Sequence, residues 1–100
     1  MKRVVISGMG LVSPLGNNKA ETLESLREAR SGIKFQEAYK EMGLRSHVAG
    51  SIDIDIDGLI DRKLRRFMGD AAAFSYIALV EAIMDAGLEE SEVSNVRTGI

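Results

Sequence analysis

The sequence contains no cysteine, and this absence excludes several kinds of chemistry within its 100 residues. Disulfide bonds, thiolate metal sites and a cysteine nucleophile are all impossible here. The only histidine is His47, so we expect neither a histidine metal cluster nor a Ser-His-Asp triad. These residues therefore carry no complete set of groups for the common forms of nucleophilic catalysis.

An excess of positive charge and a long apolar run are also missing. The sequence has 13 Lys and Arg residues and 15 Asp and Glu residues, which gives a net charge of −2. This balance argues against bulk binding to nucleic acid or to an anionic membrane, and no window is apolar enough to span a bilayer. Lys2 and Arg3 precede an apolar stretch, but its short length, its glycines and the lack of a small-residue cleavage site do not fit a signal peptide. We therefore expect a cytoplasmic protein.

What the sequence does contain is the composition of a folded protein, with 45% apolar and 28% charged residues. Its length suits one small domain or part of a larger one. No repeat, low-complexity segment or linker interrupts it. We therefore expect residues 1–100 to form one segment without an internal domain boundary.

The apolar pattern predicts an α/β protein. The continuous run Val4–Ile6 is typical of a strand buried on both faces, and a second strand is predicted to begin at residues 96–100. Helices are predicted over residues 18–31, 35–42, 59–68 and 70–86, each followed by a glycine, and the segment 45–56 is predicted to be extended. Asn18 with Glu21 fits a capping box, and Asp70 is predicted to cap the last helix.

The predicted helix 70–86 is apolar almost all round, and Glu81 and Asp85 are the only charges after its first residue. A helix of this kind is normally covered on several sides. The rest of the sequence offers few elements to cover it. Together with the strand predicted at 96–100, this indicates part of a larger α/β protein.

The glycines of "VVISGMGLVSPLGNN" raise the question of a nucleotide-binding turn. A dinucleotide fingerprint needs a third glycine where this sequence has Ser13, and the next helix cannot begin before about Asn18. The helix N-terminus would then lie too far away to receive a phosphate. We favour the alternative that Gly8, Gly10 and Gly16 allow tight turns and close backbone packing.

The segment "DIDIDGLIDRKL" resembles a calcium-binding loop. Asp53, Asp55 and Asp57 occupy its first, third and fifth positions, but Leu64 stands where a bidentate glutamate is required. The alternative is a half-exposed strand, with the aspartates on one face and three isoleucines on the other, at positions 52, 54 and 56. We favour the strand, and the sequence does not decide whether the aspartates bind a cation.

The segment "DRKLRRFM" places four cations within five residues. On a helix, Ile60, Leu64 and Phe67 would share an apolar face, and the opposite side would present three cations, Arg62, Lys63 and Arg66. This pattern fits an ordinary solvated face, and it also fits a patch that orients an acidic partner. No aromatic platform for nucleic acid lies beside it.

The stretches "VVISGMGLVSPLGNN", "LREARSGI", "RSHVAG" and "GLIDRKLRRFMGDAAAFSYIALVEAIMDAGL" resemble the N-terminus of the bacterial β-ketoacyl-acyl-carrier-protein synthases of type I. The resemblance extends over the whole chain, Met1 to Ile100. Its most specific parts are "GLIDRK" and "RFM", where the type II synthases differ. The generic G-x-G-x-[VI]-S opening is shared more widely among condensing enzymes.

This resemblance implies a fold and a reaction. The fold is a thiolase-like αβαβα sandwich of two related halves, and this chain would be an incomplete, N-terminal segment of the first half. Such enzymes work as homodimers without a metal or nucleotide cofactor. They elongate fatty acids by decarboxylative condensation of malonyl-acyl-carrier-protein with an acyl-enzyme thioester. The family's cysteine and two histidines lie beyond residue 100, and His47 matches no catalytic motif, so we expect this chain alone to be inactive.

The resemblance also implies a partner. The positions at which the family binds acyl carrier protein correspond to Arg62, Lys63 and Arg66. Arg65 departs from the family pattern, which has an apolar residue there, and "DIDIDG" is more acidic than the family pattern. An alternative function is a non-catalytic module that docks an acidic partner through the same three cations. The sequence does not indicate a preference for acyl-chain length or unsaturation.

Overall fold

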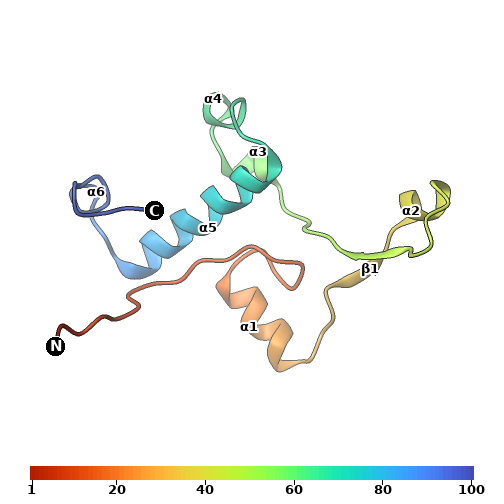
Figure 1. Ribbon diagram of the computed structural model, residues 1–100, viewed down its shortest axis with the longest axis horizontal. Coiled ribbons are helices and arrows are strands. Elements are labelled where there is room, and N and C mark those ends of the chain that lie inside the picture. Colours follow the sequence, from red (N-terminus) through yellow and green to blue (C-terminus); the bar gives the residue numbers. More distant parts are fainter. The chain divides into compact units, whose positions relative to one another are not determined.

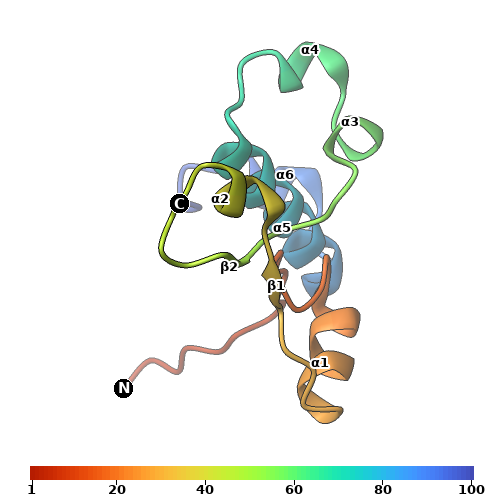
Figure 2. The same cartoon turned by 90° about the vertical axis from the view of Figure 1, so that its right-hand side faces the viewer.

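The computed structural model describes all residues 1–100, and their contacts divide the chain into two compact units. Unit 1 comprises residues 1–11 and 56–100, and unit 2 comprises residues 12–55. Figure 1 labels the helices of both units and strand β1, and Figure 2 also labels strand β2. The chain combines helices with one small two-stranded sheet.

Unit 2 contains the sheet. Its elements in chain order are α1 (Lys19–Arg27), β1 (Ile33–Phe35), α2 (Glu37–Glu41) and β2 (Val48–Gly50). The two strands are antiparallel, with Ile33 opposite Gly50 and Phe35 opposite Val48. The short helix α2 lies in the connection between the strands, as Figure 1 shows.

Helix α1 begins where the sequence predicts. The side chain of Asn18 accepts the backbone N–H of Glu21 at 2.9 Å, which confirms it as the N-cap. The predicted return bond is shifted by one residue, because the Glu21 carboxylate accepts the N–H of Asn17 at 2.8 Å. The first bond satisfies one of the N–H groups that the start of a helix leaves free, and the second satisfies the N–H of Asn17, which precedes the N-cap.

The prediction that α1 extends to Ser31 was wrong. The helix ends at Arg27, and Ala29 adopts the left-handed conformation, with φ 54°, that usually falls to glycine. Gly32 serves packing instead, since a Cβ atom on it would lie 2.8 Å from backbone and side-chain atoms of Pro14. A glycine after a helix therefore does not by itself mark the residue that ends it.

Two other glycines of unit 2 lie in turns. Ser13 and Gly16 exchange two backbone hydrogen bonds, of 2.9 and 3.1 Å, and so close a tight turn around Pro14. Gly43, with φ 69°, follows α2 as predicted. Helix α2 is shorter than predicted because Phe35 belongs to β1.

Unit 1 is built around one long helix. Its elements are α3 (Ile56–Leu59), α4 (Arg62–Arg65), α5 (Asp70–Ala86) and α6 (Glu90–Val93). The bounds of α5 are those predicted, and Gly87 ends it with φ 68°. The N-cap is Gly69, so the prediction that Asp70 caps this helix was wrong; Asp70 is its first residue.

The predicted helix 59–68 is interrupted. Ile60 is buried, with 3% of its surface exposed, and the carboxylate of Asp61 accepts the N–H of Lys63 at 2.8 Å to begin a new helix. The predicted apolar face is not formed, since Leu64 is 46% and Phe67 85% exposed. The chain therefore turns at residues 60–61, and α3 and α4 are separate helices.

The N-terminal segment of unit 1 packs closely on α5. A Cβ atom on Gly8 would lie 2.5 Å from the carbonyl oxygen of Ala82, and one on Gly10 would lie 1.9 Å from that of Ala78. No side chain fits in either place. The interpretation of these two glycines as residues of close backbone packing is thereby confirmed.

The predicted strands at residues 4–6 and 96–100 are not formed. A strand needs a hydrogen-bonding neighbour, and the structure holds one sheet, made by β1 and β2. Val4 is 93% and Ile6 84% exposed, and Val96 is fully exposed. Figure 2 shows the N-terminal residues as a long unpaired segment.

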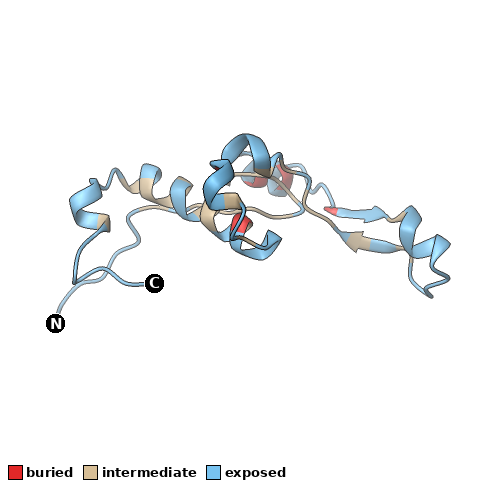
Figure 3. Cartoon of the chain, turned by 90° about the horizontal axis from the view of Figure 1, so that it is seen from above, coloured by how far each residue is buried: buried red, intermediate tan, exposed pale blue.

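Few residues are buried, as Figure 3 shows. On α5 only Ala73 is fully buried, although the helix is apolar on most sides. The covering expected for this helix is not supplied by the other elements of unit 1. No helix has the length and apolarity that crossing a membrane would require.

Candidate functional site

Helix α4 carries the predicted site residues. It lies between α3 and α5 in the chain and stands away from the axis of α5 in Figures 1 and 2. Arg62 and Lys63 are its first two residues, and Arg66 is its C-cap. The capping bond from Asp61 fixes where α4 begins and so places Arg62 and Lys63 in its first turn.

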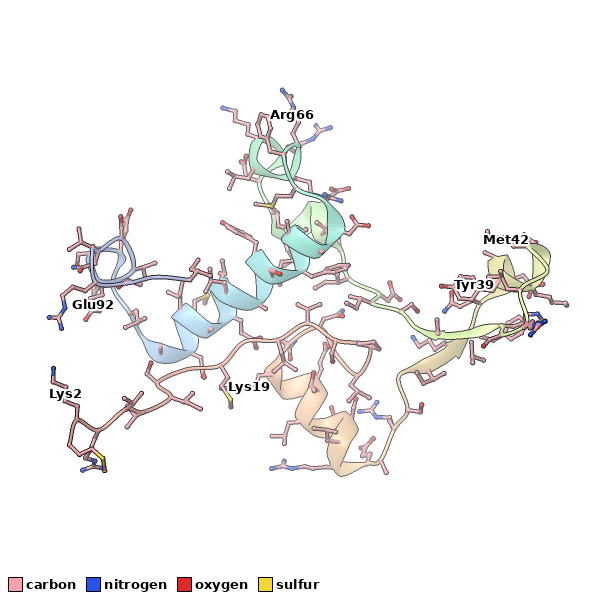
Figure 4. All side chains as sticks on the ribbon, in the orientation of Figure 1. Lys2, Lys19, Tyr39, Met42, Arg66 and Glu92 are labelled. Carbon is pink, nitrogen blue, oxygen red and sulfur yellow. The ribbon has the colours of Figure 1, made fainter.

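The three predicted cations are all exposed, and we call Arg62, Lys63 and Arg66 the basic patch. Their side chains form no hydrogen bond or ion pair within the chain. Figure 4 shows Arg66 at the outer end of α4, with its side chain directed away from the ribbon. The basic patch therefore keeps its charge available for a partner, in an attraction that salt weakens.

Arg65, the fourth cation, behaves differently. Its side chain is 26% exposed, and one guanidinium N–H group donates to Asp70 at 2.8 Å. A second contact of 3.8 Å joins its Nε to Asp57, and a third N–H group donates to the carbonyl oxygen of Met68. Arg65 is thus engaged within unit 1 and is not part of the basic patch.

The cluster of Arg65, Asp57 and Asp70 does not follow from the sequence pattern. Charge pairs three or four residues apart are predictable only within one helix. Arg65 and Asp70 are five residues apart and lie on either side of the break between α4 and α5. The signal present in the sequence was an arginine and two aspartates in one short segment, which is too common to predict a contact.

The three aspartates of the calcium-like segment do not converge. No group of three or more ligating side chains in the chain could hold a metal ion. Asp53, Asp55 and Asp57 are exposed, while the isoleucines that alternate with them are half-buried, as the alternative interpretation predicted. The predicted strand is nevertheless not formed, because this segment has no pairing neighbour and α3 begins at Ile56.

His47 takes part in packing within unit 2. Its ring meets that of Phe35 edge to face, with the centroids 5.9 Å apart and the planes at 83°. Phe35 is in β1, opposite Val48 of β2, and His47 directly precedes Val48 in the chain, so the contact lies next to the small sheet. The geometry gives His47 a structural role and joins it to no nucleophile.

Hollows lie elsewhere in both units. One in unit 1, of about 570 Å³, is lined mainly by apolar side chains of α5 and by Leu88 and Val93. A smaller one in unit 2, of about 210 Å³, is lined by polar groups that include Lys34, Ser51 and Asp53. Neither holds a nucleophile beside a general base, so the basic patch is the candidate site that the structure supports best.

Comparison with protein families gives one match that spans the chain. Residues 1–100 match the family described as "Beta-ketoacyl synthase, N-terminal domain". The match includes every element of both units, and with it the basic patch.

Individual relatives agree with this match. The chain is 54% identical over 100 residues to "3-oxoacyl-[acyl-carrier-protein] synthase 1" of Haemophilus influenzae and 52% identical over 101 residues to the Escherichia coli K12 protein of the same name. It is 32% identical over 100 residues to "3-oxoacyl-[acyl-carrier-protein] synthase 2" of Vibrio harveyi. The first two matches cover the whole chain and 25% of each relative, and the third covers 99% and 24%.

The chain therefore spans about a quarter of the length of these relatives. Identity to the two type 1 synthases is higher than identity to the type 2 synthase, which confirms the predicted resemblance to the type I group.

Proposed function

The chain belongs to the family of β-ketoacyl synthase N-terminal domains, and we propose that it is the N-terminal segment of an enzyme that elongates fatty acids. In the proposed reaction, an acyl group held as a cysteine thioester is attacked by the carbanion that forms when malonyl-acyl-carrier-protein loses CO₂. The new carbon–carbon bond gives 3-oxoacyl-acyl-carrier-protein and frees the cysteine thiol. The observation that carries this proposal is the family match over every residue.

These residues contribute no reacting group to that chemistry. They contain no cysteine, and the single histidine packs against Phe35. The nucleophile and the histidines of the proposed reaction would be supplied by other parts of the enzyme. The role left for this segment is to complete the fold and to present the basic patch.

We extend the proposal to the fold, in which residues 1–100 would together form part of the first half of a thiolase-like αβαβα sandwich. Two features support it. The apolar run Val4–Ile6 is 75–93% exposed and unpaired, as expected of a central strand whose neighbours are other segments. Helix α5 exposes Leu79, Val80 and Met84, as expected of a helix that packs between layers. The proposed enzyme is a homodimer, as the resemblance implies.

We further propose that the basic patch binds acyl carrier protein, the acidic protein that carries the substrates. The patch offers three exposed cations without internal partners. Both type 1 relatives are named as synthases of a product attached to acyl carrier protein. An acidic surface on the partner would meet these cations early in the encounter and would be oriented by them.

The enzymatic proposal is tested by assay of the full-length protein with acyl-acyl-carrier-protein and carboxyl-labelled malonyl-acyl-carrier-protein. We expect labelled CO₂ and 3-oxoacyl-acyl-carrier-protein in a ratio of about one to one. Decarboxylation without the condensed product, or no turnover at all, would contradict the proposal. An assay with the acyl group and the malonyl group both on small thiols measures the chemistry without the carrier surface and so separates catalysis from docking.

A further inference from the structure

We propose that Arg65 is a positioning residue, which holds α4 so that the basic patch faces the partner. The inference deepens the proposed docking function and rests on it. It assigns to one cation of the segment 62–66 a role opposite to that of the other three: Arg65 binds its own chain, while Arg62, Lys63 and Arg66 are left to bind another.

Helix α4 needs such a hold. It has four residues, and helices shorter than about 12 residues are marginal in water without support from tertiary contacts. Apolar packing supplies little support here, because no residue of α4 is buried and Leu64 and Phe67 are 46% and 85% exposed. Polar contacts are therefore what fix its position.

Arg65 supplies those contacts at three separate points. Asp57 belongs to α3, the carbonyl oxygen of Met68 precedes α5, and Asp70 is the first residue of α5. One planar guanidinium thus joins the elements on both sides of α4. A guanidinium has five N–H donors in a rigid fork, whereas the ammonium group of lysine is a single point of attachment. We therefore expect Arg65→Lys to keep the charge and lose the bridge.

The two carboxylates allow a test that depends on the sign of an effect. If charge alone governed docking, removing Asp57 or Asp70 would make this surface more positive and strengthen binding to an acidic partner. If Arg65 positions α4, removing either carboxylate loosens the helix and weakens binding, because only the correctly placed fraction binds. The two explanations therefore predict opposite changes in KM.

The experiment uses the full-length protein with the substitutions Asp70→Ala and Arg65→Lys. We expect each to raise KM for acyl-acyl-carrier-protein, by about twofold, with kcat unchanged. With the acyl and malonyl groups both on small thiols, KM for the acyl group should stay constant. Glu90→Ala in α6 removes an equal charge without touching Arg65 and is the matched control. A fall in KM for Asp70→Ala would overturn the inference.

A second readout does not depend on docking. Hydrogen exchange of the backbone amides of residues 63–68 measures how firmly α4 is held. We expect exchange about threefold faster in Asp70→Ala than in Glu90→Ala. Unchanged exchange would show that Arg65 does not fix the position of α4, even if the basic patch binds acyl carrier protein. Faster exchange would confirm that Arg65 fixes the position of α4. If reversal of the basic patch then left KM unchanged, the docking function would be rejected while the role of Arg65 in fixing α4 would stand.

Discussion

The Glu81 carboxylate accepts the backbone N–H of Leu11 at 3.0 Å and so ties the N-terminal segment of unit 1 to α5. One turn further along the helix, Asp85 accepts the N–H of Met9 at the same distance. The unpaired N-terminal segment has no strand partner, and these carboxylates satisfy two of its donors. The two charges inside an otherwise apolar helix are therefore explained by the backbone that crosses it.

Replacing Glu81 by alanine should free the amide of Leu11. Hydrogen bonds to charged groups contribute about 1.5–3 kcal/mol, so we expect a loss of that size in the free energy of unfolding of the full-length protein. Hydrogen exchange at Leu11 should accelerate, while Glu90→Ala should leave it unchanged. Equal exchange rates at Leu11 in both variants would contradict the contact.

Gly10→Ala should disrupt the packing of the N-terminal segment on α5. The added methyl carbon would lie 1.9 Å from the carbonyl oxygen of Ala78, and overpacking of this kind costs about 1–3 kcal/mol or more. Gly99 has no atom within 4 Å of the same position, so Gly99→Ala is the control. Thermal unfolding of the two variants compares them directly, and an equal melting temperature would show that the close approach is absent.

Asn18→Ala should destabilise α1 through the loss of its N-cap. The expected cost is about 1 kcal/mol, measured by denaturant unfolding. Asn18→Asp keeps an oxygen that can accept the N–H of Glu21 and should be close to neutral. If both substitutions lower the free energy of unfolding equally, the hydrogen bond of the cap contributes nothing to stability.

The parts of the fold that sequence predicted correctly are those set by local interactions. The bounds of α5 follow from apolar residues between Gly69 and Gly87, and the start of α1 follows from Asn18. The parts it predicted wrongly depend on distant contacts. Residue 32 must be glycine because a side chain there would collide with Pro14. The strand predicted at 4–6 needs pairing neighbours that the chain does not supply.

The candidate site shows the same division. A local cluster of charge was enough to predict that Arg62, Lys63 and Arg66 lie exposed on one short segment. It did not predict the break at Asp61, because a buried Ile60 and a capping carboxylate outweigh the helical period. The engagement of Arg65 was beyond prediction, since it depends on where α3 and α5 lie around α4.

The 100-residue chain by itself should not accept an acyl group as a thioester, because it has no cysteine. The test is incubation of the isolated chain with radiolabelled acyl-acyl-carrier-protein, followed by a search for label on the chain. The full-length protein should become labelled under the same conditions. Label on the isolated chain that hydroxylamine releases would contradict the assignment of the nucleophile to another part of the enzyme.

The most direct test of the docking function is reversal of the basic patch. The full-length protein with Arg62, Lys63 and Arg66 replaced by glutamate should show KM for acyl-acyl-carrier-protein raised about tenfold or more, an effect that shrinks as salt is added. The control reverses three other exposed cations, Arg27, Arg45 and Arg97, and should change KM little. Unchanged KM for the patch variant at low salt would show that the basic patch does not bind the carrier protein.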